Sequence, residues 1–206
     1  MMTVLIVGGS RGIGLGLVER YGADGWSVHT TTRSGESPGA AVETHRLDVR
    51  EPDQIADLAR SVPVCDVVIH VAGVYQGRSR AEMFAVNVTG AIAVCQALID
   101  GGRVVGKLAI LTSQMGARRG RTESLGDYGD SKAALNDEFR RRAPGWGERG
   151  VTAAVIHPGW VRTEMGGSSA PLSVEESVDG IVSVMAKLTA QDHGRFLTWD
   201  GRDHPW

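Results

Sequence analysis

Segments that predict buried strands alternate with segments that predict helices along almost the whole chain. The predicted strands are residues 4–7, 27–32, 44–49, 66–72, 104–112, 151–157 and 195–199. The predicted helices are residues 12–23, 52–61, 80–99, 127–142 and 174–188. Parallel strands need a crossover connection, usually a helix, so this alternation predicts a parallel sheet with helices on both faces. We therefore expect one doubly wound α/β domain over residues 1–206, with about seven strands and neither an internal repeat nor a linker.

A glycine-rich turn joins the first predicted strand to the first predicted helix. It places glycines at Gly8, Gly12 and Gly14, with Ser10, Arg11 and Ile13 between them. Glycines let the main chain approach a pyrophosphate closely, and the free N–H groups at the start of the helix favour an anion there. The spacing differs from the usual Gly-x-Gly-x-x-Gly, and a turn that only packs the helix on the strand would need similar residues. Its place directly after the first strand favours phosphate binding.

A tyrosine and a lysine lie four residues apart in the predicted helix at 127–142. Tyr128 and Lys132 fall one turn apart on the same helix face. An ammonium held near a phenol favours the phenolate, whose ordinary pKa is about 10. Lowering that pKa by roughly three units takes about 4 kcal/mol, much of which one cation in a partly dry site can supply. The alternative is an amphipathic helix with a half-buried tyrosine and a solvated lysine, which the pair alone would favour.

The charge balance removes some classes of partner. The chain carries 22 Lys and Arg against 24 Asp and Glu, a formal net charge of −2, so we expect no nucleic-acid partner. Its basic clusters, Arg118 and Arg119 with Arg121, and residues 140–142, are short and predict solvated surface. No apolar run predicts a membrane span, and residues 1–7 lack the basic start of a signal peptide.

The cysteines and histidines show no metal-ligand spacing. Cys65 and Cys95 lie inside apolar runs, which predicts reduced core residues and suits a cytoplasmic protein. The other candidates are scattered along the chain: His29, His45, His157, His193 and His204. We therefore expect no metal site.

These motifs together resemble those of the short-chain dehydrogenase/reductase family. The glycine turn and the Tyr128-x-x-x-Lys132 pair carry the resemblance. Further matches follow in family order: Asp48 and Val49, Ala72 and Gly73, Asn87, Ser113, and then Pro158, Gly159, Val161 and Thr163. The ordered set covers nearly the whole chain. The resemblance implies a Rossmann fold and an NAD(P)-dependent oxidoreductase.

The resemblance also implies a role for each catalytic residue. Tyr128 would be the general acid in reduction and the base in oxidation, and Lys132 would lower its pKa and hold the ribose of the nicotinamide. Ser113 would hydrogen-bond the substrate oxygen and the tyrosine, although it could simply cap the strand end. Asn87 would hold a water that links Lys132 to solvent, although it could simply satisfy a helix kink. Asp48 would contact the adenine ring.

The last part of the chain resembles a narrower group, the C-factor and sniffer-like carbonyl reductase branch. Residues 160–167 and 170–173 and the closing Pro205-Trp206 carry that resemblance. It implies a small carbonyl or alcohol substrate. It also leaves open a dinucleotide-binding signalling protein of C-factor type whose catalysis is vestigial. The intact serine, tyrosine, lysine and asparagine set favours the enzyme.

Two residues depart from the family pattern. His70 and Val71 replace the paired asparagines before Ala72-Gly73, and Val7 replaces the threonine before the first glycine. The hydrogen bonds of those amides to neighbouring strands must then be made by other groups. Neither departure removes a catalytic residue.

The end of the second predicted strand indicates the cofactor. NAD binders usually place an acid there, about 20 residues after the glycine turn, to accept the ribose 2′-OH. Here Thr32 and Arg33 hold that place, with no acid before Glu36, and residues 33–40 predict a loop. Arg11 and Arg33 could bracket a 2′-phosphate, or both could be solvated. We predict that NADP(H) is preferred over NAD(H).

Two expectations concern surfaces. Residues 163–173, rich in Gly and Ser, predict a short substrate loop, either a mobile lid over the cofactor or an ordinary surface loop, and the place after Pro158-Gly159 favours the lid. Family members commonly pair through the two long helices, so the resemblance implies a homodimer or homotetramer. The apolar residues of those helices could serve the core or a partner: Phe84, Val88, Leu135 and Phe139.

Overall fold

The computed structural model describes residues 1–39, 42–119 and 126–206, so Ala40 of the predicted loop and Arg121 of the basic cluster lie outside the described residues. The strands are β1 (Thr3–Val7), β2 (Ser27–Thr32), β3 (Glu43–Arg46), β4 (Cys65–His70), β5 (Val104–Leu111), β6 (Thr152–His157) and β7 (Phe196–Thr198). The helices are α1 (Gly12–Ala23), α2 (Pro52–Ser61), α3 (Arg80–Phe84), α4 (Ala91–Asp100), α5 (Gly126–Glu148) and α6 (Val174–Lys187). A π-helical segment η1 (Ala85–Gly90) and two 3₁₀ turns, η2 (Gln114–Gly116) and η3 (Ala190–Asp192), complete the regular structure of the described residues.

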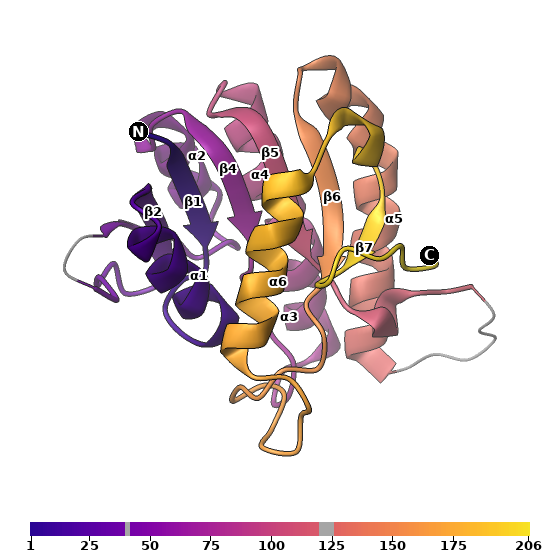
Figure 1. The fold of residues 1–206 in the computed structure, drawn as a ribbon. Helices are drawn as coiled ribbons and strands as arrows, with labels where there is room; N and C mark the ends of the chain where they lie inside the picture. Colours follow the sequence, from indigo (N-terminus) through magenta and orange to yellow (C-terminus); the bar gives the residue numbers. More distant parts are fainter. Residues whose placement is uncertain (40–41, 120–125) are drawn as a thin grey trace.

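The strands form a 7-stranded parallel sheet in the order β3-β2-β1-β4-β5-β6-β7. Helices α1 and α6 lie in front of the sheet in Figure 1, and α2, α4 and α5 lie behind it. This confirms the predicted doubly wound Rossmann fold. The strand order reverses between β1 and β4, and ligands of such sheets bind outside the carboxyl ends of the strands at that point.

The sheet is buried on both faces, which explains its continuous apolar runs. Val4 and Ile6 pack toward α1 and α6, whereas Leu5 and Val7 pack toward α2, α4 and α5, and all four side chains are 0% exposed. Successive residues of one strand thus stabilise two separate core layers.

The apolar residues of the long helices belong to the core rather than to a free surface. Leu135 and Phe139 are 0% exposed, and Val88 is 8% exposed within the same core cluster. Phe84 packs against that cluster, and the Arg80 guanidinium lies 4.7 Å from its ring centroid. Pairing of two chains stays a prediction, and it would have to use other side chains of these helices.

The predicted helix at 80–99 is one continuous stretch with a π-helical segment in its middle. Ser79 and Glu82 form a capping box at its start. Residues Arg80–Asp100 are long and apolar enough, by length and composition, to cross a membrane, so the expectation that the sequence holds no such run was wrong. More than half of that window is buried inside the protein, where α4 packs against α2, α5 and the sheet. The apolar character therefore serves the core.

Helix α5 continues past the predicted end at residue 142. Pro144 lies inside the helix, which runs to Glu148. A proline removes one helical hydrogen bond, so the continuation must be stabilised by tertiary contacts. Trp146 is 2% exposed, its Nε1 donates to Gln96 Oε1 at 3.0 Å, and its ring packs on Phe139. Burial of this tryptophan holds the last turns in place, which local sequence signals did not reveal.

Strand β4 ends at His70, two residues before the predicted end. The main-chain N–H groups of Val71 and Ala72 both donate to the carbonyl of Val7, each at 2.9 Å. Because both N–H groups donate to the same carbonyl, the regular hydrogen-bond ladder ends here and the chain turns away from the sheet. These main-chain bonds also tie β4 to β1 where the family's paired asparagines are replaced.

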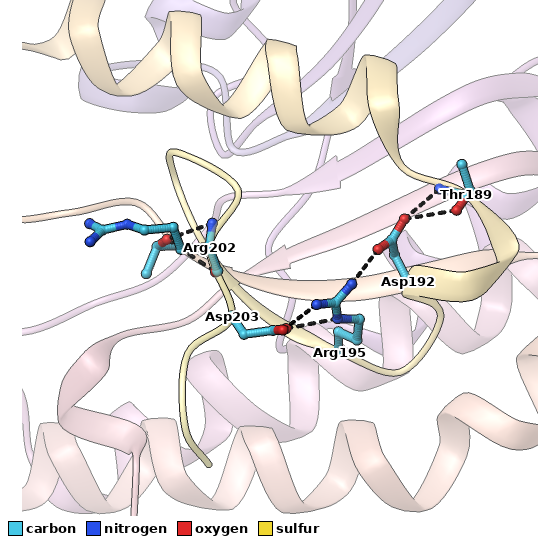
Figure 2. Close-up of polar contacts among 6 residues, drawn as sticks. Thr189, Asp192, Arg195, Arg202 and Asp203 are labelled. Atoms are coloured by element: carbon cyan, nitrogen blue, oxygen red, sulfur yellow. Dashed lines mark hydrogen bonds and ion pairs between the residues drawn. The ribbon is translucent and has the colours of Figure 1, made fainter.

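The C-terminal tail covers the outer edge of β7. Leu197 and Asp203 form an antiparallel bridge, and His204 donates its N–H to the carbonyl of Phe196 at 2.8 Å. Figure 2 shows Arg195 between the carboxylates of Asp192 and Asp203, with Nε 2.7 Å from Asp203 Oδ1. An exposed strand edge invites pairing with other chains, so this tail protects the sheet.

Candidate active site

The glycine turn and the loop after β4 meet at the point where the strand order reverses. Gly8 has φ 95° and Gly12 has φ 56°, conformations that side chains beyond glycine rarely adopt. A Cβ at Gly8 would lie 2.8 Å from the Ala72 nitrogen, and one at Gly14 would lie 2.0 Å from the Gly8 carbonyl oxygen. The three glycines are therefore needed for packing, whether or not a phosphate also binds.

The start of α1 is open to an anion. Arg11 occupies the N-cap position, no side chain caps the first turn, and no acidic residue lies in that turn. Ser10 beside it is exposed, and Ile13 packs against the α1–α6 core layer. The free N–H groups and the positive end of the helix dipole thus lie at the switch point of the sheet.

Arg11 is exposed but has a partner: its guanidinium forms an ion pair with Glu164 of the loop after β6. Thr163 also contacts the turn, because a Cβ at Gly12 would lie 3.3 Å from Thr163 Cγ2. The sequence pattern gave no indication that these two segments touch.

Tyr128 and Lys132 project from the first turns of α5 toward the carboxyl ends of β4 and β5. The Lys132 Nζ lies 5.8 Å from the centroid of the Tyr128 ring and donates to the carbonyl of Leu111 at 3.1 Å. Lys132 is 5% exposed, and this burial lowers its pKa to about 8. The lysine is thus a buried group and not the solvated one of the alternative interpretation.

The pKa of Tyr128 is raised, whereas its spacing from Lys132 predicted a lowered pKa. Burial raises the pKa of Tyr128 to about 12, while a hydrogen bond with the Ser113 side chain acts in the opposite direction and the neighbouring Tyr75 phenol adds to the rise. The Tyr75 ring centroid lies 4.7 Å from that of Tyr128. The expected lowering by Lys132 is therefore wrong, because desolvation of the phenol dominates its pKa.

Ser113 lies just after β5 and is 9% exposed. Its Oγ accepts the N–H of Met115 at 3.1 Å, and its side chain also hydrogen-bonds Tyr128. The strand-end cap and the contact with the tyrosine, which were alternatives in the sequence, are therefore both present.

Asn87 holds the loop after β4 against α5. Its amide exchanges two hydrogen bonds with the main chain of Val74, at 2.8 and 2.9 Å, and donates to Ser131 Oγ at 3.0 Å. It lies within the π-helical segment η1, and such segments are frequent at functional sites. A Cβ at Gly73 would lie 3.3 Å from Asn87 Oδ1 and 3.6 Å from Lys132 Nζ, so Gly73 lies between the two side chains.

A buried polar layer beneath the site was missed by the sequence analysis. Thr112 Oγ1 donates to Asn136 Oδ1 at 2.7 Å, and Asn136 Nδ2 donates to the carbonyl of Gly116 at 3.3 Å. Ser131 Oγ donates to the carbonyl of Tyr128 at 2.8 Å. Asn136 lies four residues after Lys132, so helical spacing could have indicated it.

The predicted adenosine side is basic. The Asp48 carboxylate accepts from Arg50 Nε at 2.9 Å, and this hydrogen bond, helped by the charge of Arg33, lowers the pKa of Asp48 to about 2. Val49 is buried against Gly90, so only its main chain is available to a ligand. Arg33 is exposed and, among the described residues, has no hydrogen bond or ion pair.

The loop after β6 is internally bonded. Val161 and Leu172 form a parallel bridge, and Trp160 Nε1 donates to the carbonyl of Gly166 at 2.8 Å. Gly159 has φ 87°, and Ser177 Oγ donates to the carbonyl of Pro158 at 2.7 Å. Motion of this loop as a lid stays a prediction.

Two apolar side chains of the same loop face solvent. Trp160 is 50% exposed and Met165 is 44% exposed. Large apolar side chains exposed beside a crevice are common in ligand sites. They are the apolar surface that this loop could offer to a substrate.

Neighbouring strands bring together two histidines and a glutamate whose spacing in the sequence did not predict a cluster. His29 and His45 lie with Glu43 on one face of β2 and β3, with their ligand atoms within 4.8 Å of one another. His29 Nδ1 and His45 Nε2 are 3.2 Å apart, and the ring centroids are 5.5 Å apart. The two nitrogens therefore face each other nearly along one line, which is the geometry of an N–H···N hydrogen bond. Burial lowers the pKa of both imidazoles.

Comparison with known proteins agrees with this geometry. The family model described as short chain dehydrogenase matches residues 2–171. The chain belongs to the short-chain dehydrogenase family, whose members are NAD(P)-dependent oxidoreductases.

Its relatives include C-factor and sniffer-like proteins. The chain is 35% identical over 129 residues to the C-signal protein of Myxococcus xanthus, covering 61% of this chain and 78% of that protein. The structure matches the carbonyl reductase Sniffer of D. melanogaster with a TM-score of 0.88 and 26% identity, over 100% of both chains. It matches a short-chain dehydrogenase/reductase of Burkholderia multivorans with bound NADP equally well, with a TM-score of 0.88, 29% identity, and 100% and 99% of the two chains covered.

Proposed function

We propose that this protein is an NADP-dependent reductase of small carbonyl compounds. The observation that carries the proposal is the Tyr128 phenol, hydrogen-bonded to Ser113 and followed one helical turn later by the buried Lys132. The glycine turn lies at the neighbouring switch point, so a dinucleotide on that turn could extend toward the tyrosine.

The residues present fit such a dinucleotide. Gly8 and Gly12 in left-handed conformations and the uncapped start of α1 would hold the pyrophosphate. The main chain of Ala72 and Gly73 would line the nicotinamide half, with Pro158, Gly159, Val161 and Thr163 on its other side. The cofactor, when bound, would supply the hydride.

The protein's own groups would supply the proton and stabilise charge. A carbonyl that accepts hydride develops negative charge on its oxygen and must be protonated there. At neutral pH the Tyr128 phenol is protonated, since its pKa is raised to about 12. It therefore carries the proton that reduction consumes. Ser113 would hydrogen-bond the substrate oxygen, and Lys132 would hold the ribose and replace the proton through a water held by Asn87.

Two arginines support NADP(H) over NAD(H). Arg33 directly follows β2 as an exposed cation, where an NAD binder usually has an acid. Arg11 could exchange its Glu164 partner for a phosphate, because both side chains of that ion pair are exposed. The Burkholderia relative has NADP bound.

The competing function is a dinucleotide-binding signalling protein, which the similarity to C-signal suggests. A protein that only binds the cofactor has no physical need for a phenol hydrogen-bonded to Ser113. Trp160 and Met165, which are exposed on the loop after β6, also fit a protein that receives a small apolar substrate.

Oxidation of NADPH, followed at 340 nm over a panel of aldehydes, ketones and quinones, tests the proposal directly. We expect turnover with at least one carbonyl class, and a lower KM for NADPH than for NADH. Cofactor binding without turnover across the panel would instead support the signalling function. Calorimetric titration with NADPH measures binding separately from turnover.

A further inference from the structure

His70, the last residue of β4, is a buried polar residue that the proposed mechanism does not use. It is 1% exposed, and its Nε2 is buried without a hydrogen-bond partner in the described part of the chain. His70 aligns with Val7 on β1 and Ile110 on β5, and both of these face the layer of α4 and α5. Because residues aligned in parallel strands share a face, the imidazole points to the α4–α5 side of the sheet, the side on which Lys132 lies.

Lys132 projects from α5 to the carboxyl end of β5, the strand next to β4. An ammonium has three donors, and one of them reaches the carbonyl of Leu111, the residue after Ile110. Burial first, and then the charge of Lys132, lower the pKa of His70 to about 3. The imidazole is therefore neutral at any working pH, and one of its nitrogens is a hydrogen-bond acceptor.

We propose that His70 is a positioning residue for Lys132, and that its Nε2 accepts a hydrogen bond from the ammonium through one buried water. An acceptor buried without a partner costs about 1–3 kcal/mol, and buried waters are found at such groups. The inference rests on the proposed function, because it matters for turnover only if Lys132 serves Tyr128. His70 would thus be one of the hydrogen-bond acceptors that keep the Lys132 ammonium in place.

The titratable groups that face Lys132 from the described elements are few. They are His70 on β4 and Tyr128 on α5, with Tyr75 beyond the Tyr128 ring. From η1 the nearest polar side chain is Asn87, which does not titrate. A change in the titration of Lys132 after substitution of His70 can therefore be assigned to the lost acceptor.

The sequence makes the measurement simple, because the chain has three lysines, Lys107, Lys132 and Lys187. NMR titration of protein with ¹³Cε-labelled lysine reads each ammonium directly, and Lys132→Met assigns its signal. We expect His70→Leu to lower the pKa of Lys132 by at least about 0.5 pH unit, a threefold change in the proton-dissociation constant. His70→Gln, which keeps an acceptor, should restore most of the difference.

A matched packing control is Val68→Ala, on the same strand and the same face two residues earlier. It should lower the melting temperature but leave the Lys132 titration unchanged. A Lys132 pKa in His70→Leu within about 0.2 pH unit of the parent would overturn the proposal.

A measurement on the parent protein covers the case in which His70→Leu does not fold. ¹⁵N NMR of the imidazole should show the proton on Nδ1 and a bare Nε2, and a proton on Nε2 would refute the acceptor role. These readouts need no substrate. An enzyme without turnover would therefore count against the proposed function and leave the His70 inference to be decided by NMR.

Discussion

Replacing Tyr128 with phenylalanine removes one hydroxyl and leaves the ring. The structure indicates what that hydroxyl does apart from chemistry: it hydrogen-bonds the Ser113 side chain. Ser113 Oγ keeps its bond from Met115 N–H, so it is not left without a partner. Loss of a neutral hydrogen bond costs about 0.5–1.5 kcal/mol, and we expect the variant to fold.

The effect on turnover should be much larger. A general acid contributes about 10²–10⁴ to the rate, or about 3–5 kcal/mol of barrier. Cofactor affinity should change little, because the proposed dinucleotide contacts come from the glycine turn, Lys132 and the arginines. We therefore expect kcat to fall at least about 100-fold with a cofactor Kd within about threefold of the parent.

Tyr75→Phe is the matched control, since it removes the same hydroxyl from the ring that packs on Tyr128 at 4.7 Å. Initial rates of NADPH oxidation, calorimetric titration with NADP and a thermal melt should be measured for the parent and both variants. Only Tyr128→Phe should lose turnover. Full activity of Tyr128→Phe, or an equal loss in Tyr75→Phe, would refute the assignment of Tyr128 as the proton donor.

Four further outcomes follow from the structure. Arg33→Asp should shift preference from NADP(H) toward NAD(H), and tighter binding of NAD(H) than NADP(H) by the parent protein in calorimetry would contradict the cofactor assignment. Gly14→Ala places a Cβ 2.0 Å from the Gly8 carbonyl oxygen, so we expect a loss of about 1–3 kcal/mol in urea unfolding, whereas unchanged stability would contradict the packing role. Burial lowers the pKa of His70 to about 3 and of His157 to about 4, so the unfolded chain binds more protons below about pH 6.5. Each histidine should cost about 2 kcal/mol of folding stability between pH 7 and pH 5, measured by urea unfolding, with a smaller loss in His157→Gln. Light scattering at micromolar concentration should give a mass of two or four chains, and a mass of one chain would refute pairing.

The fold followed from local patterns because a parallel sheet covered on both faces leaves few alternatives. Strands β1, β4 and β5 are apolar runs, and helices connect the parallel strands, so order and handedness were constrained before any contact was known. Element ends were less predictable. Pro144 should end a helix by local rules, yet burial of Trp146 carries α5 four residues further. Such a contact joins residues far apart in the chain and has no local signature.

In the site, too, local motifs were predictable from the sequence, whereas contacts between distant residues were not. Motif positions indicated which residues matter, but not which of them are buried or what they touch. The pairing of Arg11 with Glu164 joins segments about 150 residues apart, and the polar layer of Thr112 and Asn136 forms only when β5 meets α5. The raised pKa of Tyr128 is likewise a consequence of burial. The Arg11–Glu164 pair and the raised pKa of Tyr128 could not be derived from residue spacing, whereas the helical spacing of Asn136 from Lys132 was a partial signal for the polar layer.

Burial around Tyr128 and Lys132 bears on the direction of the reaction. Both groups are pushed toward their neutral forms, the phenol by a raised pKa and the ammonium by a lowered one. A neutral phenol is the form that reduction needs, whereas oxidation must first make the phenolate at a cost of about 1.4 kcal/mol for each unit between pKa and pH. A nicotinamide cation or a hydrogen bond that keeps Lys132 charged would reduce that cost. If His70 positions Lys132 as proposed, its substitution should therefore slow oxidation more strongly than reduction.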